Sequence, residues 1–293
     1  MVANPKLEAL RQQIRALEGR RLEEDARVLP FADSRLNAPL PGRGLPLGAL
    51  HEFCADGLES ELSPAVTAFA ATVAAGILRK HDGFLLWAAT RADCYAPGLA
   101  GVGLDLSRIV WVDCAKDAEV LGVMEEALHS HALAAVLGEA GALTLKTARR
   151  LDAAARQSGA AALLLRRHLS KPSPAALLAS GAAATRWRVG AVAGEGDAFS
   201  TGTYPLPSRE RVVSEAGRVR GASWSSLAPP SFRLDLEYCR NGKTASWIVE
   251  VSDGARGNDA EADHVRVVAE LRDDACTPEK AAACETWGAA RAR

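Results

Sequence analysis

The stretch LAAVLGEAGALTLKTARRLDAAARQSGAAALLL, residues 133–165, decides the fold class. It opens with a short apolar run, continues through a segment with helical spacing of apolar and charged residues, and closes with a second apolar run. Short continuous apolar runs are typical of strands buried on both faces, and a helix between two such strands is the crossover of a parallel sheet. The stretch therefore predicts a strand, a helix (residues 145–157) and a strand in an α/β fold.

The same alternation continues toward the N-terminus. The predicted upstream elements are strands at residues 49–54 (ALHEFC), 84–89 (FLLWAA) and 109–112 (IVWV), and a helix at residues 118–129. Ser63 followed by Pro64 has the pattern of an N-cap and a first helical residue, which predicts a helix from there to about Arg79.

Toward the C-terminus the apolar runs give way to strict alternation. The alternating segments are TRWRVGAV from Thr185, SFRLDLEYCR from Ser231 and ASWIVEV from Ala245, with the hairpin signal Asn241-Gly242 between the last two. In the first of them we expect Trp187 in the core and Arg186 and Arg188 in solvent. The predicted fold is thus α/β, with a mainly parallel central sheet flanked by helices and extended by antiparallel C-terminal strands.

The chain divides into three predicted parts: an arm at residues 1–30, a core domain at residues 31–254 with a flexible loop at about 194–226, and a flexible tail at residues 255–293. Prolines and glycines at residues 30–46 predict a linker after the arm. The arm is an amphipathic helix whose narrow apolar stripe is formed by Leu7, Leu10, Ile14 and Leu17. Two placements stay open for this candidate protein-docking helix: against a partner, or folded back on its own domain.

Charge and cysteine content exclude several classes. The 293 residues carry 35 basic and 36 acidic side chains, a formal net charge of −1, so the chain cannot hold nucleic acid mainly through bulk positive potential. Six cysteines without a C-x-x-C pair predict reduced thiols and no zinc site. Charges near the N-terminus and the lack of a long apolar span predict a cytoplasmic protein with no membrane contact.

Several phrases resemble the RecA recombinase ATPases. They are GLPLGALHEF (44–53), FLLWAATRADCYAPGLAGVGLDLSRIVWV (84–112) and QSGAAALLLRRH (157–168). The narrower phrases LPLGALHEF, CYAPGLAGVGLD, VMEEALHSHALAAVLGE and ATRWRV resemble the ImuA family of SOS mutagenesis accessory proteins, which is related to the division inhibitor SulA. The resemblance implies a RecA-like core over residues 44–254.

The resemblance also locates a degenerate phosphate loop, formed by Ser60, Glu61, Leu62 and Ser63. Ser60 and Glu61 stand where the RecA family has Gly-Lys, and a carboxylate there repels a triphosphate. Other ATPase positions map near Arg91, to Gly138 and near Arg167. Glu139, next to Gly138, remains a candidate ligand for magnesium. The favoured interpretation of Glu139 is a solvated loop carboxylate. We therefore expect no enzyme activity and no cofactor.

The remaining candidates for contact with DNA or a partner are basic. They lie on the helix at residues 145–157 and after the strand at residues 160–165: Arg149, Arg150, Arg166, Arg167, His168 and Lys171. A guanidinium binds a phosphate or a carboxylate equally well, so internal pairing, partner docking and DNA contact stay open for these residues.

The resemblance implies a function as well: a non-catalytic adaptor or regulator of DNA-damage-induced translesion synthesis. Implied partners are an ImuB-type inactive Y-family polymerase and an error-prone DnaE-type polymerase. RecA, single-stranded DNA and a second copy of the chain are further candidates. The alternatives are a DNA-dependent ATPase with a degenerate phosphate loop and a SulA-like inhibitor of cell division.

Overall fold

The computed structural model describes residues 28–56, 59–91, 93–130, 132–141, 143–167, 182–192, 231–251 and 265–271. The calls on Leu7, Leu10, Ile14, Leu17, His168 and Lys171 lie outside these ranges. No described helix combines the length and the apolar composition that a bilayer crossing requires.

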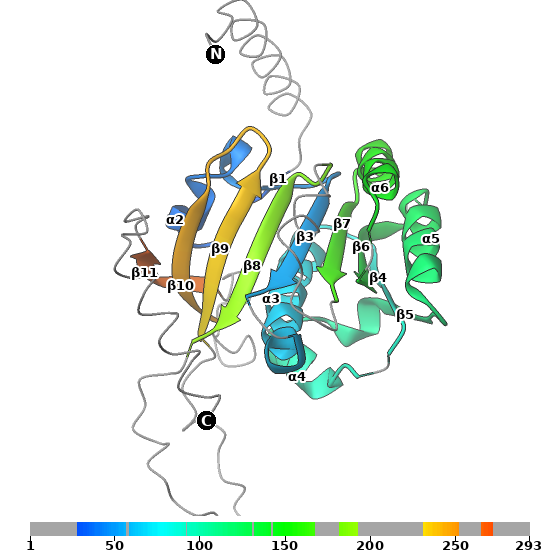
Figure 1. Ribbon diagram of the computed structural model, residues 1–293, viewed down its shortest axis with the longest axis horizontal. Helices are drawn as coiled ribbons and strands as arrows, with labels where there is room; N and C mark the ends of the chain where they lie inside the picture. The colour runs from blue at the N-terminus through cyan, green and yellow to red at the C-terminus, as the bar shows by residue number, and fades with distance from the viewer. Residues whose placement is uncertain are drawn as a thin grey trace, which may run out of the picture.

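The described strands form one large sheet with the order β11-β10-β9-β8-β3-β7-β6-β4-β5 (Figure 1). Its strands are β3 (Leu50–Ala55), β4 (Phe84–Ala89), β5 (Ile109–Asp113), β6 (Leu133–Ala140), β7 (Ala161–Arg166), β8 (Thr185–Ala191), β9 (Ser231–Cys239), β10 (Ala245–Val251) and β11 (Val265–Leu271). The pairs from β5 through β8 are parallel, and β8 to β11 pair antiparallel. The predicted α/β fold class is confirmed.

Helices cover both faces of the parallel part of the sheet. They are α3 (Glu59–Lys80) and α4 (Ala96–Gly101) on one side and α5 (Asp117–Leu128) and α6 (Leu145–Ser158) on the other (Figure 1). Each face has its own apolar core, because successive strand residues point to opposite sides. Phe53 and Trp187 pack with α3, whereas Leu50 and Leu164 pack with α5 and α6.

The ends of α6 follow from local chemistry. The hydroxyl of Thr144 accepts a hydrogen bond from the Thr147 N–H at 3.2 Å, which satisfies one free donor of the first turn. Gly159 ends the helix with a φ of 79°, a left-handed conformation that glycine adopts without strain. These caps place the helix close to where the sequence predicts it.

The predicted start of α3 is wrong. The helix begins at Glu59 rather than at Ser63, and Pro64 lies inside it. A proline this near the start removes a single main-chain hydrogen bond, which the apolar packing of the remaining turns outweighs.

The predicted linker is also wrong, because residues 28–49 belong to the core. β1 (Val28–Leu29) pairs with β2 (Leu45–Pro46), and the short helix α2 (Ser34–Asn37) lies between them in the chain. The Asn37 side chain bonds the main chain of Phe31 at both N–H and C=O, and Phe31 packs edge-on against Trp187. The segment therefore covers the antiparallel strands on the α3 side of the sheet, and the core begins before residue 31.

Residues 265–271 are a second correction to the predicted division. They form β11 instead of part of a tail, and Val265 and Val267 are buried against the core. A seven-residue strand with one apolar face gains more by pairing with β10 than by staying in solvent.

Candidate functional site

The carboxyl ends of β3, β6 and β7 meet at one edge of the sheet, where open α/β folds usually bind ligands. Two buried ionic clusters lie there. The Glu139 cluster consists of Glu139, Arg167, Trp87, Thr67 and Cys94, on the α3 side. The Glu52 cluster consists of Glu52, Arg166 and Arg186.

In the Glu139 cluster both carboxylate oxygens accept hydrogen bonds. The Trp87 indole N–H donates to Oε1 at 2.7 Å, and the Arg167 guanidinium lies 2.8 Å from Oε2. Arg167 also donates to the Thr67 hydroxyl at 3.1 Å, which ties β7 to helix α3. Glu139 is only 3% exposed, so its interpretation as a solvated loop carboxylate is wrong.

The thiol of this cluster is not a nucleophile. Burial, and then repulsion by the neighbouring Glu139 carboxylate, raises the pKa of Cys94 to about 12. A thiol with such a pKa stays protonated near neutral pH, whereas covalent chemistry uses the thiolate. Cys94 therefore contributes packing and a weak donor to Glu139 at 3.8 Å.

The Glu52 cluster joins three neighbouring strands, β3, β7 and β8. Glu52 Oε2 lies 3.0 Å from Arg166 Nη1 and 3.6 Å from Arg186 Nε, and Arg166 also donates to the Gly141 carbonyl at 3.1 Å. Strand register explains the contact, because Glu52 pairs directly with Arg186 across β3 and β8. Breaking a buried ion pair leaves an uncompensated charge and costs several kcal/mol, about 3–5, so these partners hold three strands together.

The expectation that Arg186 is solvated is wrong, while Trp187 is in the core as predicted. Glu52 was missed as a site residue. Its only signal was a carboxylate in the middle of the apolar strand ALHEFC, which requires a buried cation as its partner.

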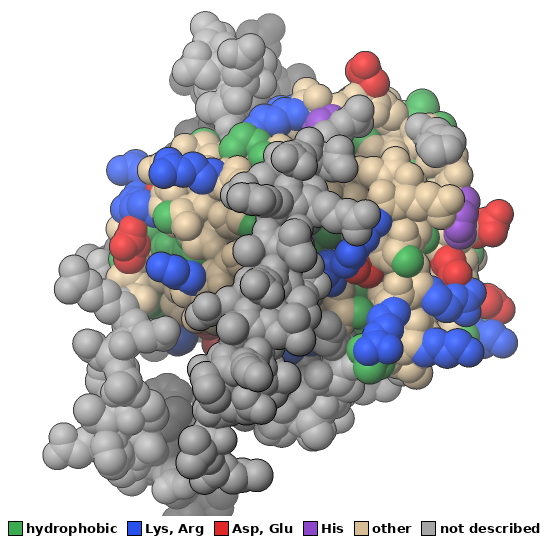
Figure 2. All heavy atoms as spheres, turned by 90° about the horizontal axis from the view of Figure 1, so that it is seen from above, with side chains coloured by type: hydrophobic (Ala, Val, Ile, Leu, Met, Phe, Trp, Pro, Cys, Tyr) green, Lys and Arg blue, Asp and Glu red, His purple; other side chains and the backbone are tan. Residues whose placement is uncertain are grey.

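Charge at this edge is balanced pair by pair. Beyond the Glu52 cluster, Arg188 forms ion pairs with Asp56, at 3.5 Å, and with Glu237. The opposite edge of the sheet, which Figure 2 presents, also carries basic and acidic side chains near one another. The charged groups therefore form ion pairs mainly with one another.

Comparison with known proteins shows the family of the chain. No family model matches the chain. Protein ImuA of Caulobacter vibrioides, recorded in two strains, is 33% identical over 233 residues, covering 78% of this chain and 86% of that protein. The chain belongs to the ImuA family.

The positions of this ImuA family member that the resemblance aligns with ATPase residues lie in different surroundings. A Cβ on Gly138 would overlap Met124 Sδ and lie 3.1 Å from Val120, so α5 packs where a side chain would project. Arg91 is exposed and lies 3.7 Å from Asp93. Ser60, Glu61 and Leu62 lie in the first turn of α3 with undescribed side chains, and Ser63 is half-buried.

The basic candidates fall into two groups in this ImuA family member. Arg166 and Arg167 form the internal ion pairs described above. Arg149 and Arg150 are exposed on α6, where Arg150 pairs with Glu125 at 2.6 Å. The structure therefore does not join the four described candidates into one basic surface.

Proposed function

We propose that this ImuA family member is a non-catalytic adaptor in DNA-damage-induced translesion synthesis, within the ImuA/ImuB mutagenesis system. Its proposed partners are an ImuB-type inactive Y-family polymerase and an error-prone DnaE-type polymerase, with RecA as a further partner. Family membership supports the system, and the ionic clusters support the absence of catalysis.

The single observation that carries the proposal is the pairing of Arg167 with Glu139. Nucleotide hydrolases hold cations and a water-activating group free to meet the phosphates. Here the guanidinium and the carboxylate neutralise each other at 2.8 Å; the Glu139 side chain is buried, and the Arg167 side chain is only 11% exposed. Such a pair supports a rigid scaffold rather than a phosphate site.

The test measures ATP binding and hydrolysis with and without single-stranded DNA. We expect neither activity in the wild type, and Glu139→Gln should change only stability, since the amide keeps the shape while the Arg167 charge loses its partner. The exposed variant Arg149→Ala is the matched control. DNA-stimulated hydrolysis that Glu139→Gln abolishes would favour the DNA-dependent ATPase and overturn the adaptor.

A second test addresses the partners. The intact chain should co-purify with the ImuB-type protein, and a version without residues 1–27, which contain the apolar stripe of the predicted docking helix, should lose much of this association. Because Leu29 is buried in the core, the deletion should stop before Val28. Retention of ImuB by the shortened chain would remove the helix from the proposed docking segments.

A further inference from the structure

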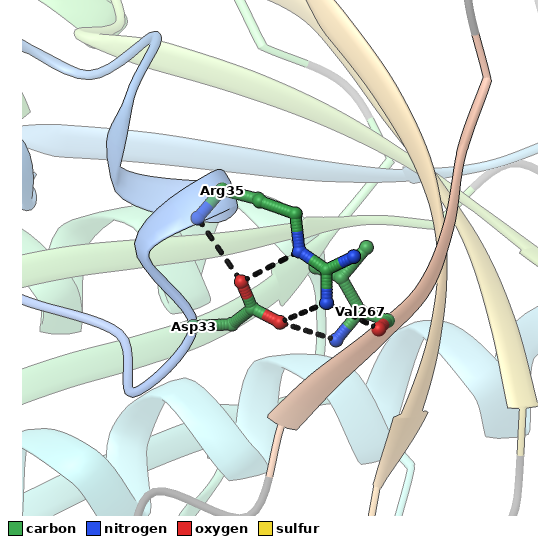
Figure 3. Close-up of polar contacts among 3 residues, drawn as sticks. All are labelled: Asp33, Arg35 and Val267. Atoms are coloured by element: carbon green, nitrogen blue, oxygen red, sulfur yellow. Dashed lines mark hydrogen bonds and ion pairs between the residues drawn. The ribbon is translucent and has the colours of Figure 1, made fainter.

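The two edges of the large sheet differ. At the β11 edge, Val267 is held by side chains: its N–H donates to Asp33 at 3.0 Å, and its C=O accepts from Arg35 at 2.7 Å (Figure 3). Asp33 and Arg35 are themselves paired at 2.7 Å. Charged side chains that occupy edge groups in this way block the addition of another strand.

The opposite edge has no such cap in the described structure. β5 ends the sheet order and pairs only with β4 among the described strands. Val110 and Trp111 on β5 and Phe84 on β4 are 44%, 46% and 46% exposed. We call these three residues the β5 strip. An exposed, apolar edge strand offers unpaired main-chain groups and contact area together.

The strip is held rigidly. The Trp111 ring stacks on buried Trp87 with centroids 5.0 Å apart and an angle of 30°. The Trp87 indole in turn donates to Glu139, so the Glu139 cluster fixes the ring beneath Trp111. A fixed aromatic surface loses little conformational entropy when a partner covers it.

The charged residues around the β5 strip indicate what kind of segment would bind there. Exposed Asp82 and Asp105 precede β4 and β5 at one end, and exposed Asp113 ends β5 at the other. Arg108, next to the strand, directs its guanidinium at the carbonyls of His81 and Gly83. The exposed basic residues nearest along the chain are Lys116 and Lys80, and Lys80 donates to the Pro30 carbonyl at 3.0 Å. Two copies joined at this edge would bring acidic rims together, which disfavours self-association.

We propose that the β5 strip binds an extended segment of another protein, which adds to the sheet as a further strand. The segment has apolar side chains at alternate positions, to cover Trp111 on the α3 side of the sheet, and basic residues at its ends, to meet the acidic rim. This inference is independent of the proposed function, because it names a surface and a chemistry rather than a polymerase.

The test titrates the full chain with a ten-residue synthetic peptide that alternates valine and threonine between terminal lysines, and follows tryptophan emission. Two matched peptides carry a central proline or terminal glutamates. We expect saturable binding of the lysine peptide, at least tenfold weaker binding of the proline peptide and several-fold weaker binding of the glutamate peptide. Trp111→Phe should remove most of the emission change.

The blocking variant is Val110→Lys, with Arg149→Ala as its control. We expect Val110→Lys to weaken peptide binding at least tenfold with an unchanged urea midpoint, because Val110 is nearly half exposed. Failure of every peptide to bind, equal binding of the proline peptide, or no effect of Val110→Lys would overturn the proposal. A dimer in sedimentation that Val110→Lys dissociates would also overturn it, since the occupant would then be a second copy.

Discussion

His51 shows how one buried residue fixes a local network. Its ring lies between the Pro46 carbonyl, 2.7 Å from Nε2, and the Thr185 hydroxyl, 2.8 Å from Nδ1. The Trp187 indole N–H can only donate, and it donates to the same hydroxyl. A carbonyl only accepts, so Nε2 carries the proton and Thr185 donates to Nδ1. The neutral tautomer satisfies every partner.

This arrangement predicts loss of stability in acid. Burial lowers the pKa of His51 to about 4, from 6.5 in the unfolded chain. The unfolded state therefore binds more protons between these values, so the contribution is complete above pH 6.5 and falls as pH drops toward 4. We expect a loss of about 2 kcal/mol at pH 5 relative to pH 7, measured by urea unfolding.

The contribution of His51 is isolated by comparing how the free energy of unfolding changes with pH in the wild type and in a His51 variant. His51→Gln should be less stable than the wild type at pH 7 but should lose much less stability between pH 7 and pH 5. An equal loss in both proteins would assign the pH dependence to other groups.

Among the elements, strands that form a distinct apolar run were predictable from the sequence. A strand whose neighbours in the chain are charged and alanine-rich was not. The runs at Phe84–Ala89 and Ala161–Arg166 are continuous, mostly buried and followed by polar residues, so the sequence predicts them closely. β11 carries an equally regular alternation, with Val265 and Val267 buried and Arg266 and Val268 exposed. It was missed because charged, alanine-rich sequence surrounds it, and local composition outweighed periodicity.

The end of α3 depends on a residue far along the chain. Arg108 donates to the carbonyl of Leu78, in the last turn of the helix, and to those of His81 and Gly83, which follow it. Its planar fork reaches several acceptors at once, which an ammonium group cannot do. We expect Arg108→Ala to lower the free energy of unfolding by about 1–3 kcal/mol, and Arg108→Lys to recover only part of this loss. Urea unfolding gives both values.

The control for Arg108 is Arg149→Ala, an exposed change on α6 that should stay within about 0.5 kcal/mol of the wild type. A fully stable Arg108→Lys variant would mean that charge alone, rather than the fork, holds the end of the helix.

At the scale of the whole molecule, the candidate site was only partly predictable. The sequence identified Arg166 and Arg167 at the correct edge of the sheet, because a strand ends there. The sequence could not decide whether these arginines pair internally, dock a partner or contact DNA. Their carboxylate partners lie 114 and 28 residues away in the chain, and strand order decides whether they meet. Gly138 is similar: only the packing of Met124 shows that a side chain there would have to displace its neighbour. Long-range register, rather than local pattern, decides the chemistry of the site.

Strand β11 makes the sheet sensitive to where the chain is cut. A chain ending at residue 254 loses the buried Val265 and Val267, bares the edge of β10 beside Trp247, and leaves Asp33 and Arg35 without the Val267 main chain. Burial of two valines contributes about 3 kcal/mol or more, so this chain should melt earlier and aggregate. A chain ending at Leu271 keeps every described strand and should melt like the intact protein. Circular dichroism melts and gel filtration distinguish the two, and equal melting of both would show that β11 adds nothing to the core. Association with ImuB should therefore be tested with the chain that ends at Leu271. If that chain no longer binds ImuB, the loss can be assigned to residues 272–293, because the sheet is intact.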